Sequence, residues 1–195
     1  MNLTDFSRKC VDHLMDSNID PDKAEICAYG LELALHTLLS TSVLLLIGFL
    51  AHRLGEAALI IFLYYANQTA GGGYHAKSHF MCTLLMAIGL IVCLYSLNLF
   101  WPVWLLWILP LCSATVLWCF PVHLHLNKRY LSPEMSSLKK KSRLVITTSV
   151  LIAFLIIILH LPGVFQKAAA LGITVSAISR VSGILSAPKT DHSPF

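Results

Sequence analysis

The sequence contains few charged residues. Asp, Glu, Lys and Arg make up 12% of its 195 residues, whereas a soluble globular domain carries about 25%. Hydrophobic residues account for 56%, and they gather in runs close to the roughly 20 residues that cross a bilayer core. This balance excludes an ordinary soluble domain and indicates an integral membrane protein surrounded by membrane lipid.

Other absences exclude further classes. The six cysteines form no CxxC pair, so we expect neither a disulfide framework nor a zinc knuckle. Three of them lie in apolar runs, where a thiol usually packs as a small buried hydrophobic group: Cys93, Cys112 and Cys119. Basic residues exceed acidic ones only by 14 to 10, so nucleic acid is not an expected partner. No Gly/Ser/Pro-rich linker divides the apolar runs, which predicts one domain over residues 1–195.

The apolar runs predict an all-α, polytopic membrane protein with about six transmembrane helices. We expect an amphipathic helix on the membrane surface within residues 1–26, a transmembrane bundle over 27–185 and a polar tail at 186–195. The predicted spans are 27–51, 56–70, 80–97, 99–122, 144–161 and 164–185. The second would be only about 22 Å long as a helix, which makes it either a thin span or a re-entrant segment.

Basic residues set the expected orientation, because short cytoplasmic loops are enriched in Lys and Arg. The predicted loop at 123–143 is the most basic, with Lys128, Arg129, Lys139, Lys140, Lys141 and Arg143. We therefore place this loop in the cytoplasm and the turn near Asn98, which has no basic residue, outside. Six crossings then put both termini and the segment 71–82 on the cytoplasmic side of the cell membrane, and leave only Arg53 and Lys167 outside.

One segment gathers residues that are reactive rather than apolar. It reads Gly71-Gly72-Gly73-Tyr74-His75-Ala76-Lys77-Ser78-His79-Phe80-Met81-Cys82. A cysteine attacks as the thiolate, which a nearby imidazole can generate near neutral pH, and Lys77 would add positive potential. Gly72 and Gly73 can bring backbone N–H groups close to a substrate carbonyl, as an oxyanion site requires. The segment thus contains the groups needed for acyl transfer from a peptide.

Spacing alone favours His79 as the base. On one straight helix, His75 and Cys82 would stand about 10.5 Å apart along the axis, which exceeds a hydrogen-bond reach of roughly 3 Å. His79 lies three residues before Cys82 and would be its neighbour on the helix surface. His75 can serve only if the glycine-rich segment folds it back over Cys82. A non-catalytic alternative also stays open, with interfacial histidines beside a buried thiol.

The segment resembles the motif of the accessory gene regulator protein B (AgrB) family, membrane-embedded cysteine endopeptidases of Gram-positive quorum sensing. The resemblance rests on Gly72-Gly73-Tyr74-His75-Ala76 followed by Cys82, after a short apolar segment in a six-span chain. It implies that His75 is the base and Cys82 the nucleophile, so that residues 75–82 do not form one straight helix. Gln68 stands where relatives commonly carry arginine, which implies different substrate recognition here.

The same resemblance implies a substrate and a product. The substrate would be a small AgrD-type precursor peptide with an acidic C-terminal tail, and no cofactor is implied. Cys82 would attack the bond before the tail, and a Cys or Ser of the peptide would close the resulting thioester into a thiolactone or lactone autoinducer. The residues Lys139, Lys140 and Lys141 could attract the acidic tail. A homodimer is a further expectation, since small residues can pack helices together: Ala168, Ala169, Ala170 and Gly172.

Two other functions stay open on the sequence alone. A transporter or channel subunit could use His75, His79 and Glu32 as a proton or metal path, because ionisable groups inside spans usually have a function. Glu32 and His36 lie near the start of the first span, where snorkelling to water explains them better. Transporters also usually contain repeated halves, which this sequence lacks. A metal site of His75, His79 and Cys82 would lack a fourth ligand nearby.

Overall fold

The computed structural model describes residues 7, 9–11, 13, 21–74, 76, 78–122 and 132–186, with the backbone alone at 21–23, 79 and 132–134. Throughout this part of the chain the regular structure is helical, without any strand. The predicted all-α fold is therefore confirmed. The chain forms two compact units, Met1–Val43 and Leu44–Phe195.

The first unit contains most of α2 (Pro21–Leu50). Before it, residues 7, 9–11 and 13 are helical, with Val11 buried and Lys9 and His13 exposed. This pattern agrees with the amphipathic N-terminal helix that the sequence predicts. Within α2, a ring nitrogen of His36 lies 3.5 Å from the Ser40 hydroxyl, so this histidine is engaged inside its own helix.

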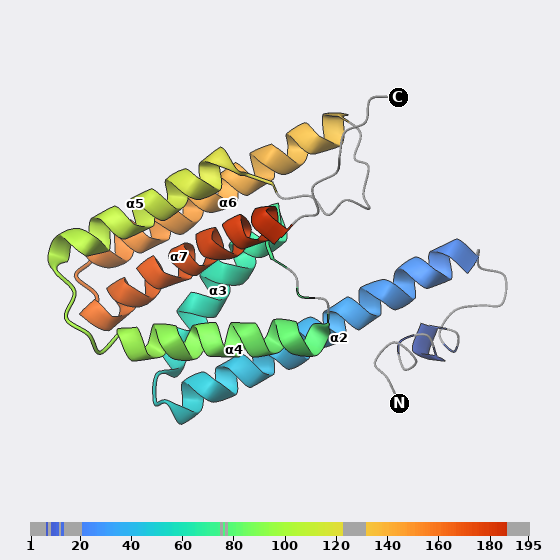
Figure 1. The fold of residues 1–195 in the computed structure, drawn as a ribbon, viewed down its shortest axis with the longest axis horizontal. Helices are drawn as coiled ribbons and strands as arrows, with labels where there is room; N and C mark the ends of the chain where they lie inside the picture. Colours follow the sequence, from blue (N-terminus) through green and yellow to red (C-terminus); the bar gives the residue numbers. More distant parts are fainter. Residues whose placement is uncertain are drawn as a thin grey trace. The chain divides into compact units, whose positions relative to one another are not determined.

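The second unit contains the end of α2 and five further described helices (Figure 1). These are α3 (Leu54–Gly71), α4 (His79–Ser96), α5 (Val103–Cys119), α6 (Ser132–Ile158) and α7 (Gly163–Ser186). Each predicted span overlaps one helix, although some of the bounds differ. Three described helices are long and apolar enough to cross a membrane: α2 from Ala24, α6 from Met135, and α7. The helices α4 and α5 are apolar but shorter.

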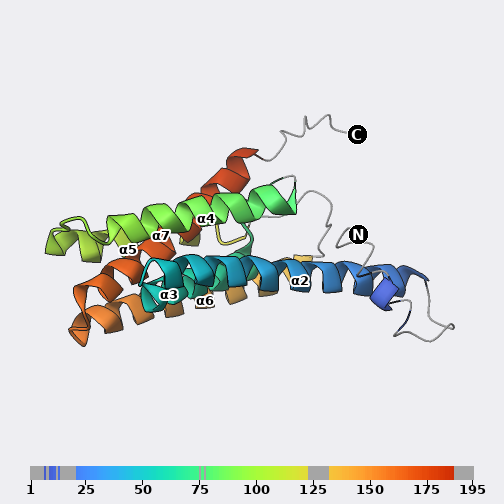
Figure 2. The same cartoon turned by 90° about the horizontal axis from the view of Figure 1, so that it is seen from below.

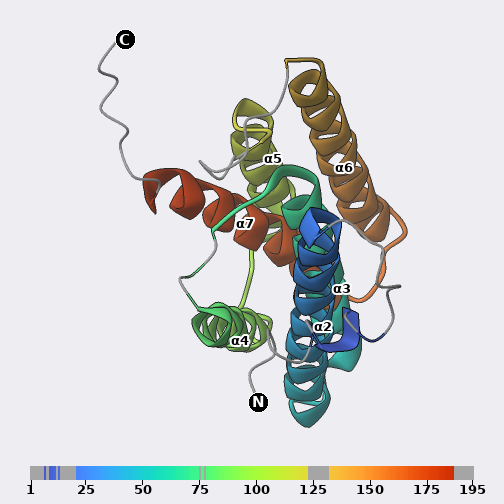
Figure 3. The same cartoon turned by 90° about the vertical axis from the view of Figure 1, so that its right-hand side faces the viewer.

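Helix α7 is the central element of the second unit. It packs most extensively against α3 and α5, less against α6 and least against α4, and Figure 3 shows it between α4 and the other three. Figure 2 shows the reason for the short contact, since α7 is inclined to α4. Small residues allow α7 to approach α3 closely, because Ala168, Ala169 and Ala170 are fully buried and a Cβ on Gly172 would lie 2.9 Å from the Leu63 Cβ. These small residues, which the sequence offered for a homodimer, are thus used inside the chain.

Hydrogen bonds at one end of this unit join α3, the α4–α5 turn and α7. Arg53 donates to Asn98 Oδ1 at 3.1 Å, and Lys167 Nζ donates to the carbonyl oxygens of Leu97 (2.9 Å) and Leu99 (2.7 Å). The two basic residues predicted to share one side of the membrane therefore lie at one end of the unit. Helix α3 starts here and, with 18 residues, extends about 27 Å to the opposite end, as α4 does in return.

A buried guanidinium joins the helices at that opposite end. Arg180 is completely buried; its Nη1 donates to the carbonyl oxygens of Phe120 (2.9 Å) and Pro121 (2.7 Å), and its Nη2 donates to that of Asn67 (2.8 Å). These carbonyls belong to the C-terminal ends of α5 and α3, where partial negative charge accumulates. No carboxylate in the described part of the chain pairs with this cation. Arg180 therefore fixes two helix ends to α7 through carbonyl dipoles.

The outer surface is apolar. Helix α4 exposes large hydrophobic side chains along its whole length: Phe80, Met81, Leu84, Leu85, Ile88, Ile91, Val92 and Tyr95. In water such a surface promotes association, whereas lipid chains solvate it. Together with the three helices long enough to span a bilayer, this surface indicates a membrane protein.

The basic region differs from the prediction. Residues 123–143 were expected to form a loop, but α6 begins at Ser132 and already includes Lys139, Lys140 and Lys141. The sequence Ser-Pro-Glu at its start is favourable for helix initiation. At 27 residues the helix is about 40 Å long, longer than a hydrocarbon core of about 30 Å, so its basic first turns can extend beyond the apolar layer.

Helix α5 and its cysteines also require correction. The predicted span 99–122 shortens to 17 residues, because Pro102 forms the N-cap and the helix ends at Cys119. Cys93 is buried as expected, but Cys112 and Cys119 are exposed. Both side chains are exposed on α5, so neither thiol packs in the core.

Replacing Arg180 by leucine should destabilise the fold. The change removes the hydrogen bonds to three carbonyl oxygens and leaves the Pro121 oxygen with the Ser142 hydroxyl as its donor, which should cost about 3 kcal/mol of unfolding free energy. Arg180→Lys keeps the charge but reaches fewer carbonyls, so its stability should lie between that of the wild type and that of Arg180→Leu. Thermal unfolding in detergent micelles, followed by tryptophan fluorescence, measures the effect.

The matched control for this prediction is Arg53→Leu. Arg53 forms a partly exposed ion pair with Glu56 at 3.2 Å, and such pairs contribute about 0–1 kcal/mol. Equal melting temperatures for the two leucine variants would contradict the role assigned to Arg180.

Candidate functional site

The glycine-rich segment ends α3 and turns the chain towards α7. The helix stops at Gly71, as the sequence predicts, and Gly72 follows with φ 75° and ψ −175°, a conformation that favours glycine. The Gly72 N–H donates to the carbonyl oxygen of Gln68 at 2.8 Å. The Tyr74 N–H then donates to the carbonyl oxygen of Ser179 at 3.0 Å. The turn is therefore held at both of its ends.

Close approach explains the glycines on either side of Gly72. A Cβ at Gly71 would overlap the Arg180 guanidinium and a backbone carbonyl, and a Cβ at Gly73 would overlap the end of the Gln68 side chain. Gln68 Oε1 also accepts a hydrogen bond from the Ser179 hydroxyl at 3.4 Å. The residue that stands in place of the arginine expected from the resemblance thus braces the glycine turn against α7.

Helix α4 begins only after the motif histidine. Ser78 is its N-cap, in an extended conformation (φ −130°, ψ 149°), and the Ser78 hydroxyl accepts a hydrogen bond from the Met81 N–H at 3.2 Å. Residues 75–82 therefore do not form one straight helix, as the resemblance implied. His75 and Lys77 lie outside the described residues, as does the side chain of His79.

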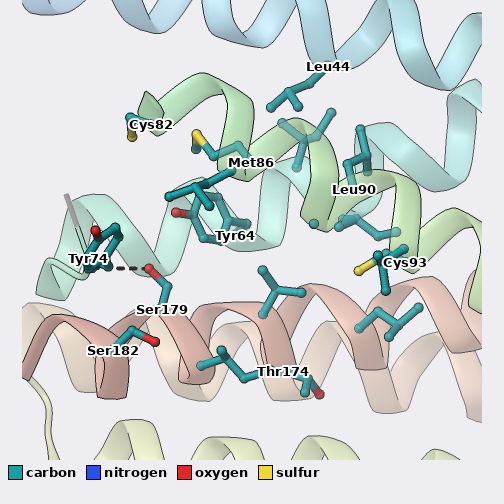
Figure 4. Close-up of a pocket in the computed structure, with 18 residues that line it drawn as sticks. Leu44, Tyr64, Tyr74, Cys82, Met86, Leu90, Cys93, Thr174, Ser179 and Ser182 are labelled. Carbon is teal, nitrogen blue, oxygen red and sulfur yellow. Dashed lines mark hydrogen bonds between the residues drawn. The ribbon is translucent and has the colours of Figure 1, made fainter. Parts of the chain in front are cut away.

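Cys82 lies in the first turn of α4. Its N–H donates to the Ser78 carbonyl oxygen at 3.1 Å, and the positive end of the helix dipole lies at this turn, where negative charge is stabilised. The half-buried side chain lines a cavity of about 660 Å³ between α3, α4 and α7 (Figure 4). Tyr64 on α3 and Ser179 on α7 line the same cavity as Cys82.

Of the two predicted oxyanion glycines, one already uses its donor. The Gly72 N–H bonds the end of α3, whereas the Gly73 N–H has no hydrogen-bond partner in the described part of the structure. A free N–H next to a bend is a suitable donor to a developing oxyanion. Gly73 is itself buried against the Gln68 side chain and does not line the cavity beside Cys82.

The predicted residues are only partly brought together. Tyr74 and Cys82 line the same cavity, and Gln68 contacts Gly73 beside it. The three lysines predicted to bind the tail are exposed on α6 and do not line the cavity. They lie at the same end of the unit as the glycine turn, because Ser142 on α6 donates to the Pro121 carbonyl that Arg180 also binds.

Sequence reasoning missed several residues of this site. Arg180 could have been found, because an ionisable residue inside an apolar run is unusual and commonly functional or structural. Tyr64, Ser179 and Ser182 gave no local signal, since nothing in the sequence places α3 and α7 beside α4.

Comparison with protein-family models matches residues 7–180 to Accessory gene regulator B (AgrB). The chain belongs to this family. Comparisons with curated proteins and with solved structures gave no match. AgrB membership connects the chain with the processing of accessory gene regulator peptides in quorum sensing and implies an AgrD-type peptide as its substrate.

Replacing Gly71 by alanine should displace the Arg180 guanidinium. The added methyl group would overlap the guanidinium and the adjacent carbonyl, so overpacking should cost about 1–3 kcal/mol of unfolding free energy. Gly163→Ala is the matched control, because a Cβ there meets no neighbouring atom within 4 Å. A melting temperature for Gly71→Ala no lower than that of the control would contradict the predicted overlap with the Arg180 guanidinium.

Proposed function

We propose that this AgrB protein is a membrane-embedded cysteine endopeptidase that removes the C-terminal tail of an AgrD-type precursor peptide. Cys82 is the nucleophile and His75 its base. The observation that carries the proposal is the position of Cys82, in the first turn of α4 and lining a cavity, in a helix that begins only at His79. Because α4 starts at residue 79, His75 and Cys82 are not separated by seven residues of one straight helix.

The first step forms a thioester. The His75 imidazole takes the thiol proton, and the Cys82 sulfur attacks the carbonyl carbon of the residue before the tail. The Gly73 N–H donates to the oxyanion of the tetrahedral intermediate. The carbon–nitrogen bond then breaks, the tail leaves as an amine with the proton from His75, and the rest of the peptide stays bound to sulfur.

The second step closes the ring. A Cys or Ser side chain within the bound peptide attacks the thioester carbonyl, which releases Cys82 and gives a cyclic thiolactone or lactone. A thioester keeps enough acyl-transfer potential for this exchange, provided that water does not attack first. The largely apolar lining of the cavity supports ring closure over hydrolysis, because it excludes water from the bound acyl group.

The site and both termini face the cytoplasm in this proposal. The basic turns of α6 and the glycine turn lie at the same end of the second unit, joined through Ser142, Pro121 and Arg180. The exposed side chains of Lys139, Lys140 and Lys141 can therefore attract the acidic tail as it leaves Cys82, at about 1 kcal/mol per charge near a surface.

Cys82→Ala should abolish cleavage of the precursor peptide. Wild-type protein should carry an adduct equal in mass to the precursor without its tail, visible by mass spectrometry and released by hydroxylamine. Cys93→Ala is the matched control, since Cys93 is a second thiol in the same cavity and should be dispensable. Tail release by Cys82→Ala at the wild-type rate would refute the proposal.

His75→Ala should lower kcat for tail release by about 10²- to 10⁴-fold, the usual contribution of a positioned base. His79→Ala should stay within a few-fold of wild type, because the proposal assigns it no proton transfer. Single-turnover cleavage rates measure both. The opposite ranking would make His79 the base, as the spacing along a helix favours.

A further inference from the structure

The cavity beside Cys82 extends well beyond the nucleophile. Most of its α4 lining follows one helix face, at Cys82, Leu85, Met86, Gly89, Leu90 and Cys93, and Val92 lies beside that face. The 11 residues from Cys82 to Cys93 correspond to roughly 16 Å along the helix. At about 660 Å³, the space is within the range of about 300–1,000 Å³ found for ligand pockets.

The two ends of the cavity differ in chemistry. Tyr64, Tyr74, Ser179 and Ser182 gather at the end where Cys82 lies, and Leu90 and Cys93 lie towards the other end (Figure 4). Away from Cys82, the lining includes residues of the main apolar core, among them Leu44, Ile60 and Leu90. The polar groups are thus placed where a peptide carbonyl would react, and the apolar end is suited to a hydrocarbon side chain.

We infer that this cavity binds the apolar side chains of the one or two substrate residues on the acyl side of the cleaved bond. The inference rests on the proposed function, because the acyl group attached to the Cys82 sulfur must lie within a bond length of the cavity lining. Charge complementarity sets the direction of the peptide. An acidic tail cannot enter an apolar cavity without a large desolvation penalty, whereas the exposed lysines of α6 offer it a basic surface. The acyl side therefore occupies the cavity and the tail stays outside.

Gly89 sets the size of the side chain that the cavity accepts. It lies on the lining face of α4, seven residues after Cys82, and a Cβ there would meet no neighbouring atom within 4 Å. A side chain at this position therefore has room to start into the cavity and to take up part of its volume. Gly30, on α2 and outside the lining, has the same open surroundings and provides a matched control.

The test measures acylation of Cys82 by phenyl thioesters of N-acetylalanine, N-acetylleucine and N-acetylphenylalanine. In this exchange the acyl–sulfur bond of the reagent breaks, a bond from the acyl carbon to the Cys82 sulfur forms, and thiophenol leaves with the thiol proton. Peptide mapping by mass spectrometry gives the rate at Cys82, and the exposed Cys27 in the same sample reports the intrinsic reactivity of each reagent.

We expect wild-type Cys82 to react at least about tenfold faster with the leucine and phenylalanine reagents than with the alanine reagent, after normalisation to Cys27. Gly89→Phe should remove this preference and leave the alanine rate within a few-fold, and Gly30→Phe should keep the preference. A wild-type Cys82 without side-chain preference would overturn the inference and leave the cavity to lipid chains. A preference that survives in Gly89→Phe, or an equal loss for all three reagents, would overturn it as well.

The thioester test of the cavity and the cleavage test of the proposed function can fail independently. Tail release that continues in Cys82→Ala would refute the peptidase proposal whatever the thioester preferences are. A peptidase that depends on Cys82 but shows no effect of Gly89→Phe would refute the assignment of the cavity alone.

Discussion

The arrangement of the candidate site depends on one buried cation. Arg180 binds carbonyl oxygens at the C-terminal end of α3 and just after α5, and has no carboxylate partner within the described residues. A charge buried in this way is stable only when several dipoles solvate it, so the two helix ends must converge on the guanidinium. The glycine turn starts directly at the end of α3, and its position follows from this convergence.

Helix α4 is packed more tightly in its C-terminal half than in its N-terminal half, where Cys82 lies. Towards its C-terminus, Leu90, Cys93, Leu94 and Leu97 are buried in the main core. Towards its N-terminus, Phe80, Met81 and Leu84 are exposed, and the short contact with α7 leaves the cavity open beside Cys82. In the proposed reaction a peptide enters, reacts and leaves as a ring, and this requires one wall that is not tightly packed. The anchored half of α4 keeps the sulfur in place, and the unpacked half provides access.

Much of the architecture could be predicted because its causes are local. Runs of apolar residues predicted the helices to within a few residues for most spans, the three glycines marked the end of α3, and the seven-residue spacing of His75 and Cys82 indicated a family that the comparison confirms. The prediction of a basic loop at 123–143 was wrong because a favourable helix start at Ser132 extends α6 beyond its apolar part. The prediction that Cys112 and Cys119 are buried was wrong because apolar composition cannot tell a lipid-facing side of α5 from a core-facing side.

The sequence by itself determined the class of protein: low charge and long apolar runs require helices in lipid, and the motif names the candidate nucleophile. Only the tertiary structure decided that Arg180 is buried against helix ends, that Gln68 and Ser179 brace the glycine turn, and that an apolar cavity continues from Cys82 to Gly89 and beyond. The physical reason is separation along the chain. Asn67 and Arg180 are 113 residues apart, and Tyr74 and Ser179 are 105 residues apart, so no local pattern of hydrophobicity or spacing can report their contact.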